Sequence, residues 1–172
     1  MTSLDAILNR ASRAMGGVRL KETAIVRFLG LQKIPMLFVL GPRVLRIDEA
    51  GCEVQIPLRY ASRNHLGSMY VGALAAGADL ASGINALFAI RQAHPRVLPV
   101  FKEMRAEFLK RADGDVHFIC TAGRRILEAV AQADQTGERV TLAVDVVATV
   151  PSKYGSEPVA RFTMGLSLKR KD

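Results

Sequence analysis

Apolar residues occupy nearly every side of a helical wheel drawn for the segment from about residue 68 to residue 92. Between Met69 and Ile90 this segment holds a single ionisable acid, Asp79, close to its middle. A helix that is apolar all round in a soluble protein is buried on nearly all sides. The pattern therefore predicts one long helix that the rest of the chain surrounds, with a carboxylate at its centre.

On both sides of this helix, apolar and polar positions alternate with a period of two, which is typical of β-strands. The predicted strands are residues 44–47, 52–58, 97–110, 116–121, 140–150 and 159–168. A short helix over residues 124–133 is ended by Gly137, and residues 151–158 are expected to form a loop. This order predicts an α+β fold, with a mainly antiparallel sheet of about six strands wrapped around the long central helix.

Helical periodicity also precedes the first strand. Residues 3–15 carry an amphipathic stripe that Gly16 and Gly17 end, and residues 22–31 look helical. Pro35 and Pro42 are expected to break the apolar segment that follows. No repeat or low-complexity tract divides the chain, so we expect a single domain over residues 1–172, with a helical N-terminal extension (1–40) and a core (41–170).

The wheel of the long helix divides into two unequal faces. The neighbours of Asp79 on its own face are all small: Gly72, Ala75, Ala76, Ser82, Gly83 and Ala86. The opposite face carries large residues that are expected to fill a core: Tyr70, Leu74, Ile84 and Phe88. Two interpretations stay open, because the small stripe suits either a closely packed backbone or a substrate slot in which Asp79 acts as base or nucleophile.

Length and apolarity alone would also allow this helix to span a membrane. A carboxylate such as Asp79 at mid-span would cost about 2.5–3.5 kcal/mol, and the chain offers no second span. We therefore expect no membrane span. The N-terminus lacks the charged and apolar regions of a secretion signal, which makes a cytoplasmic location the expectation.

The formal net charge is +8, from 24 Lys and Arg against 16 Asp and Glu, but the basic residues are spread along the chain. No helix-turn-helix pattern or zinc-ligand spacing occurs and Trp is absent, so nucleic acid is not an expected partner. A basic surface also suits an anionic small molecule. Cys52 and Cys120 lie in alternating apolar segments and are expected to be buried free thiols, and no metal site is predicted.

The pattern Asn64-x-x-Gly67-x-x-Tyr70-x-Gly72, followed by Asp79, resembles the hotdog-fold thioesterases of the phenylacetate-pathway type. Their pattern is Asn-x-x-Gly-x-x-His-Gly-Gly, with a catalytic Asp nine residues after the His, and Tyr70 to Asp79 is also nine. The segment is also similar to an uncharacterised bacterial branch of that superfamily whose members are labelled thioesterases. The resemblance extends from about residue 40 to residue 169, and it implies the hotdog fold.

The resemblance implies hydrolysis of an acyl-CoA thioester, with Asp79 as base or nucleophile and the amides of Val71 and Gly72 stabilising the oxyanion. Tyr70 stands where the family has His and Val71 where it has Gly; the Tyr70 hydroxyl can donate a hydrogen bond but cannot act as a near-neutral base. Two alternatives stay open. One is a non-catalytic dimer that binds acyl-CoA or fatty acid, and the other is a hydratase that uses His65.

Further residues near the helix are candidates for contact with the substrate. They are Asn64, His65, Gly67, Ser68, Ala75, Ala76, Ser82, Gly83, Arg59, Arg63 and Lys102. For some, a structural role is also open: Asn64 can fix the turn, Ser68 can cap the helix, and Ser82 can bond either the carboxylate or the Ala78 carbonyl. The three basic residues would meet the anionic nucleotide arm; coenzyme A is then part of the substrate, and no separate cofactor is expected.

Helix geometry predicts a homo-oligomer, a dimer or a dimer of dimers. Nine residues rotate by 900° and rise about 13 Å, so Tyr70 and Asp79 point in opposite directions and cannot meet within one chain. If the helix start and the carboxylate cooperate, as in the resembled family, the helix start comes from a second subunit across a two-fold axis.

Overall fold

The computed structural model describes residues 17–171. The expected helix over residues 3–15 lies outside them. The described chain forms six strands: β1 (Arg43–Asp48), β2 (Gly51–Ile56), β3 (Val97–Phe108), β4 (Val116–Cys120), β5 (Val140–Thr149) and β6 (Pro158–Arg170). Its helices are α2 (Leu20–Lys33), α3 (Pro35–Leu40), α4 (Val71–Gln92), α5 (Gly123–Thr136) and α6 (Pro151–Tyr154).

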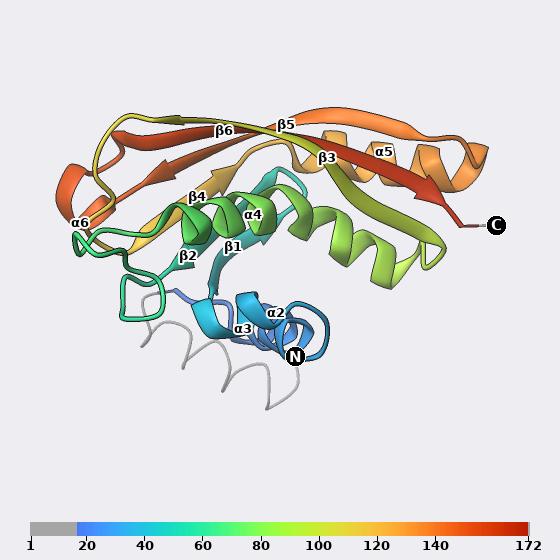
Figure 1. Ribbon diagram of the computed structural model, residues 1–172. Helices are drawn as coiled ribbons and strands as arrows, with labels where there is room; N and C mark the ends of the chain where they lie inside the picture. The colour runs from blue at the N-terminus through green and yellow to red at the C-terminus, as the bar shows by residue number, and fades with distance from the viewer. Residues whose placement is uncertain (1–16, 172) are drawn as a thin grey trace.

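All six strands form one sheet in the order β1-β2-β4-β5-β6-β3, and every neighbouring pair is antiparallel. The sheet curves over α4, the long helix, which lies along its concave face (Figure 1). A curved antiparallel sheet around one long helix is the hotdog fold. The predicted α+β class and the long central helix are therefore confirmed.

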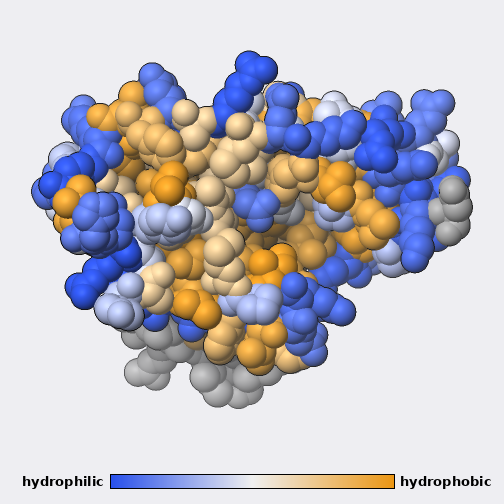
Figure 2. Space-filling model, in the orientation of Figure 1, coloured by the Kyte–Doolittle hydropathy of each residue, from blue (hydrophilic) through white to orange (hydrophobic). Residues whose placement is uncertain are grey.

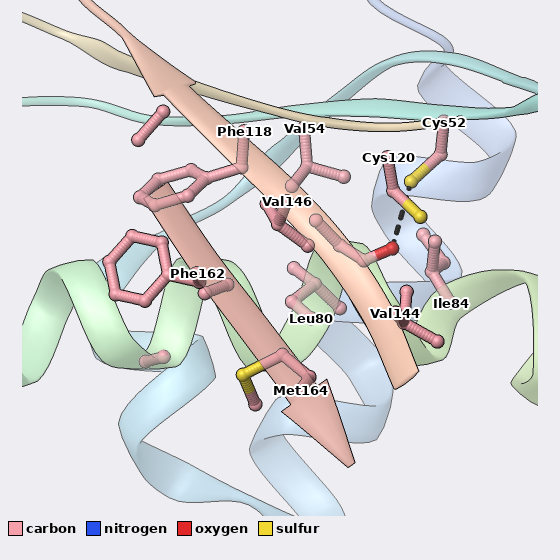
Figure 3. Close-up of a cluster of buried hydrophobic side chains, with 14 of the residues drawn as sticks. Cys52, Val54, Leu80, Ile84, Phe118, Cys120, Val144, Val146, Phe162 and Met164 are labelled. Carbon is pink, nitrogen blue, oxygen red and sulfur yellow. Dashed lines mark hydrogen bonds between the residues drawn. The ribbon is translucent and has the colours of Figure 1, made fainter. Parts of the chain in front are cut away.

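The core lies between α4 and the strands of the sheet. Figure 3 shows Leu80 and Ile84 of α4 beneath side chains of the sheet, among them Val54, Phe118 and Val146. Cys52 of β2 and Cys120 of β4 lie opposite each other on neighbouring strands, and both are buried free thiols, as predicted. The Cys52 Sγ donates a hydrogen bond to the Ala81 carbonyl at 3.1 Å, which ties β2 to the helix (Figure 3).

The helices α2 and α3 pack beside β1. The Thr23 hydroxyl of α2 accepts a hydrogen bond from the Val44 amide of β1 at 2.9 Å. Pro35 and Pro42 break the apolar segment, as predicted: α2 ends at Lys33, α3 begins at Pro35, and Pro42 lies between α3 and β1. The first turn of a helix needs no backbone N–H from its first residue, so a proline is tolerated there. The helix ends at Gly41, whose φ of 60° is left-handed.

The start of α4 corrects two expectations. Ser68 is not the N-cap; that position belongs to Tyr70, and the helix begins at Val71. Tyr70 does not fill the core either, because it is 55% exposed and precedes the first helical turn. The loop expected over residues 151–158 also contains the short helix α6.

Among the described residues, α4 is the one helix that is long and apolar enough to cross a membrane by length and composition. Within its most apolar stretch, 61% is buried inside the domain. Because the sheet covers this helix, its apolar character is explained by its place as the core helix.

Candidate active site

One side of α4 is left partly open by the sheet. Four residues on that side are partly exposed and follow one another at spacings of three and four: Gly72, Ala75, Asp79 and Gly83. The other three small residues of the predicted face, Ala76, Ser82 and Ala86, are buried. The open face around Asp79 is therefore present, and it is narrower than the wheel predicts.

Aromatic rings lie beside the first and last glycines of this face. A Cβ atom on Gly83 would lie 3.4 Å from the ring of Phe101 on β3, and one on Gly72 would lie 2.6 Å from the ring of Tyr70. The small residues thus make room for neighbouring side chains at the two ends. Asp79 lies between these ends, with Ala75 one turn before it.

The Asp79 carboxyl is partly buried, and no described residue forms a hydrogen bond or an ion pair with it. Burial raises the pKa of the Asp79 carboxyl above its usual value, because desolvation disfavours the charged form. A partly buried acid whose oxygens are free to accept is suited to take a proton or to attack a carbonyl carbon.

The start of α4 presents two backbone donors. The Tyr70 carbonyl accepts the amides of Ala73 and Leu74, but no described residue accepts those of Val71 and Gly72. The Tyr70 side chain does not cap the helix. Unpaired amides at the positive end of a helix dipole favour an anion or an oxygen that becomes negative.

The loop before α4 holds several predicted residues together. The Asn64 Oδ1 accepts the amides of Leu66 at 2.9 Å and Ser68 at 3.2 Å, so Asn64 fixes this turn, which was one of the roles left open for it. A depression of about 660 Å³ opens beside the loop. Its lining residues are Tyr60, Ala61, Arg63, Asn64, His65 and Gly67.

Three predicted residues have other positions. Ser82 is buried, and its hydroxyl donates to the carbonyls of Ala78 at 2.8 Å and Asp79 at 3.0 Å, which corresponds to the backbone alternative. The Arg59 guanidinium donates to the carbonyls at the end of α3, Leu40 and Gly41. Lys102 is exposed on β3, in the irregular stretch between Phe101 and Met104.

Sequence reasoning did not select Phe101 or Tyr60. Phe101 reads as an ordinary apolar strand position, and nothing in its spacing says that its ring approaches Gly83 of the helix. The register irregularity that follows Phe101 shifts the alternation along β3, so the side of the sheet that each residue faces could not be counted from the sequence.

Comparison with known proteins assigns the chain to a family. Residues 22–166 match the family described as Domain of unknown function (DUF4442). The chain belongs to this family. No curated protein matches it. The matched region of this DUF4442 chain contains α4, the loop before it and nearly the whole sheet.

Solved structures similar to the DUF4442 chain include three from bacteria. A Pseudomonas aeruginosa protein of unknown function, given as a probable thioesterase, is 27% identical with a TM-score of 0.68, over 87% of this chain and 96% of that one. A Chlorobaculum tepidum protein of unknown function is 12% identical with a TM-score of 0.74, over 90% and 98%. A Haemophilus influenzae thioesterase is 12% identical with a TM-score of 0.60, over 85% and 88%. The last two similarities support the fold alone.

Proposed function

We propose that this DUF4442 protein hydrolyses acyl-CoA-type thioesters and that Asp79 is its catalytic carboxylate. The observation that carries the proposal is the partly buried Asp79 carboxyl, without a described partner, on the open face of the central helix. The similarity to a probable thioesterase at 27% identity supports the same class of reaction.

In this reaction Asp79 acts on the thioester carbonyl in one of two ways. As a base it takes a proton from water, and the resulting hydroxide attacks the carbonyl carbon. As a nucleophile it forms an acyl anhydride that water then cleaves. In both routes the carbonyl oxygen becomes negative, the C–S bond breaks, and the coenzyme A thiolate leaves and takes up a proton. The amides of Val71 and Gly72 are the proposed donors to the negative oxygen.

In this proposal, the helix start whose amides act together with Asp79 belongs to a second copy of the chain. The strand β3 supports such an assembly, because within residues 17–171 it is at the end of the sheet and pairs only with β6. Its exposed apolar residues are Leu98, Val100, Met104 and Phe108. Figure 2 shows apolar side chains gathered on the face over β3 and α4. An unpaired apolar edge strand is a surface that pairs with another chain.

The anionic arm of coenzyme A needs cationic contacts, which Arg63 and Lys102 can supply. Arg63 borders the depression beside the start of α4, where its guanidinium lies 5.3 Å from the centre of the Tyr60 ring. A guanidinium in this position can pair with a phosphate, and His65 in the same depression can add a hydrogen bond.

The decisive experiment measures release of coenzyme A from a panel of acyl-CoA thioesters of different chain lengths. We expect turnover by the native chain and a loss of at least about 100-fold in kcat for Asp79→Asn. Glu128→Gln, which removes an exposed carboxylate of α5, is the matched control and should keep native activity. Equal activity of Asp79→Asn and the native chain would remove Asp79 from the mechanism.

Base and nucleophile are distinguished by a single-turnover reaction in water labelled with a heavy oxygen isotope. A nucleophilic Asp79 gains the isotope when its anhydride is cleaved at the aspartyl carbon, whereas a general base does not. Mass spectrometry of the peptide that contains Asp79 shows whether the heavy isotope has been incorporated.

Binding without hydrolysis is the second candidate, favoured by Tyr70 and Val71 at the positions of His and Gly in the resembled pattern. It predicts no turnover of any thioester but a rise in melting temperature with acyl-CoA. Hydration of crotonyl-CoA would instead point to the hydratase alternative with His65. If no acyl-CoA is turned over and none raises the melting temperature, all three candidates are refuted.

The assembly is tested by light scattering after gel filtration. Val100→Asp places a charge on the exposed edge strand, and Val39→Asp places one on a similarly exposed residue of α3. We expect Val100→Asp to lower the molecular mass to that of one chain and to abolish turnover, and Val39→Asp to change neither. A native protein that is monomeric and active would refute the two-copy site.

A further inference from the structure

A second pocket lies on another side of α4 from Asp79. It has a volume of about 480 Å³ and lies between α2, the turn that joins β1 to β2, the C-terminal half of α4, and α5. Phe88 lines it and is nine residues after Asp79, so the two side chains point in opposite directions from the helix axis. This pocket is therefore separate from the open face that carries the proposed hydrolysis.

Part of the lining of this second pocket is apolar. Ile25 of α2, Phe88 of α4 and Leu127 of α5 contribute to it, together with Ile47 at the end of β1. Volumes of about 300–1,000 Å³ lined mainly by apolar groups are typical of small-molecule sites.

Asn85 adds an unpaired polar group to the wall. Its residue exposure is 4%, and its Nδ2 donates to the Asp48 carbonyl at 2.8 Å. Its Oδ1 is buried and has no hydrogen-bond partner in residues 17–171. A buried acceptor that has lost water and gained no donor is unfavourable. Asn85 and Asp48 both line the pocket, so a donor brought by a ligand would meet this need once the Asn85 amide turns its oxygen toward the pocket.

The charges around the pocket are balanced. Three basic and three acidic residues line it: Arg19, Lys21, Arg91, Glu22, Asp48 and Glu49. Arg19 is paired with Glu22, and Asp48 with Arg46. A lining of this kind selects neither a strong anion nor a strong cation, which favours a neutral ligand.

We propose that this pocket binds a small, neutral, mainly aromatic molecule with one N–H or O–H group, of the indole or phenol class. Its ring packs on Ile25, Phe88 and Leu127, and its N–H or O–H donates to the Asn85 Oδ1. The site does not depend on thioester hydrolysis and holds whether or not the protein is a thioesterase.

Indole is the probe, because the chain contains no Trp and indole can be excited at wavelengths beyond the absorption of the three Tyr. We expect its emission to shift to shorter wavelength on binding and to saturate at one indole per chain. N-methylindole has nearly the same shape and lacks the donor. It should bind about tenfold more weakly, because it leaves the Asn85 oxygen unpaired.

Two matched variants locate the probe. Ala89 lines the second pocket and Ala75 lies on the open face near Asp79, and both are partly exposed residues of α4. Ala89→Phe should fill the second pocket and abolish indole binding, whereas Ala75→Phe should leave it unchanged. The reverse result would place the probe beside Asp79 and overturn the proposal.

Asn85→Leu tests the hydrogen bond itself. This variant should bind indole and N-methylindole equally, because the acceptor is gone. A preference for indole that persists in Asn85→Leu, or equal binding of the two probes to the native chain, would show that Asn85 does not accept the donor. Ala89→Phe keeps the site testable if Asn85→Leu does not fold.

Discussion

The ring of Phe118 on β4 lies where a side chain on Gly77 of α4 would begin. A Cβ atom at Gly77 would be 2.3 Å from two ring carbons of Phe118, and Phe118 is fully buried. The central helix thus meets the sheet with backbone against ring at this point. This contact explains a glycine in the middle of a helix that otherwise favours alanine.

The first prediction follows from that contact. Gly77→Ala should lower the free energy of unfolding by about 1–3 kcal/mol, because the buried Phe118 ring must move to admit the methyl group. Gly83→Ala is the matched control on the same helix, since its Cβ would make an ordinary 3.4 Å contact with Phe101. It should be neutral or stabilising by up to about 1 kcal/mol. Urea denaturation measures both, and equal losses would contradict the contact.

The second prediction concerns stability and pH at Asp79. Burial raises its pKa in the folded chain, so folding favours the protonated carboxyl. The contribution of this carboxyl to the free energy of unfolding is complete below its pKa in the unfolded chain. It is lost as pH rises through its pKa in the folded chain. Asp79→Asn is uncharged throughout and should be more stable than the native chain at neutral pH, by about 1 kcal/mol. The gain should shrink on acidification; a gain that grows would contradict a raised pKa.

The third prediction concerns the rate of the proposed hydrolysis. Both the base and the nucleophile need the ionised form of Asp79, so kcat/KM should rise with pH through the raised pKa of this carboxyl. The midpoint of the rise should lie above the pKa of an ordinary aspartate. The Glu128→Gln control should have the same profile. A rate that is independent of pH across this range would argue against Asp79.

The fourth prediction concerns the attachment of α2 to the sheet. Thr23→Val removes the acceptor of the buried Val44 amide and should lower the free energy of unfolding by about 1–3 kcal/mol. Thr23→Ser keeps the hydroxyl and should restore most of the loss. Thr121→Val, at an exposed position after β4 whose hydroxyl has no hydrogen-bond partner among the described residues, should change stability by less than about 0.5 kcal/mol. A similar loss in Thr121→Val would show that the effect does not come from the hydrogen bond.

The fifth prediction concerns the two thiols. Burial raises the pKa of both Cys52 and Cys120, which lowers their thiolate fraction. In the folded protein a disulfide-exchange reagent should therefore label neither on the timescale of an enzyme assay, whereas in denaturant it should label two thiols per chain. Rapid labelling of the native protein would show that one thiol is accessible. Unreactive thiols also allow the same reagent to detect released coenzyme A.

The order of strands and helices was readable from the chain, because alternation and helical periodicity are local properties of the sequence. The open face of α4 was readable for the same reason: Gly72, Ala75 and Gly83 share a helical face with Asp79 whatever surrounds it. The residue at which α4 begins was not readable from the sequence. Met69 forms a β-bridge with Arg63 and donates its amide to the Ala112 carbonyl, so the chain is still extended there and the helix begins two residues later.

By itself, the sequence determined the α+β class, the long central helix and the place of Asp79 on its small-residue face, since these depend on spacing along one chain. Only the tertiary structure decided which parts of α4 the sheet covers. It buries Ala76 and Ser82, leaves Tyr70 exposed, and sets Phe118 against Gly77. It also brings α2 and α5 beside Asn85 to form the second pocket. Such contacts join residues far apart in the chain, so no local pattern could specify them.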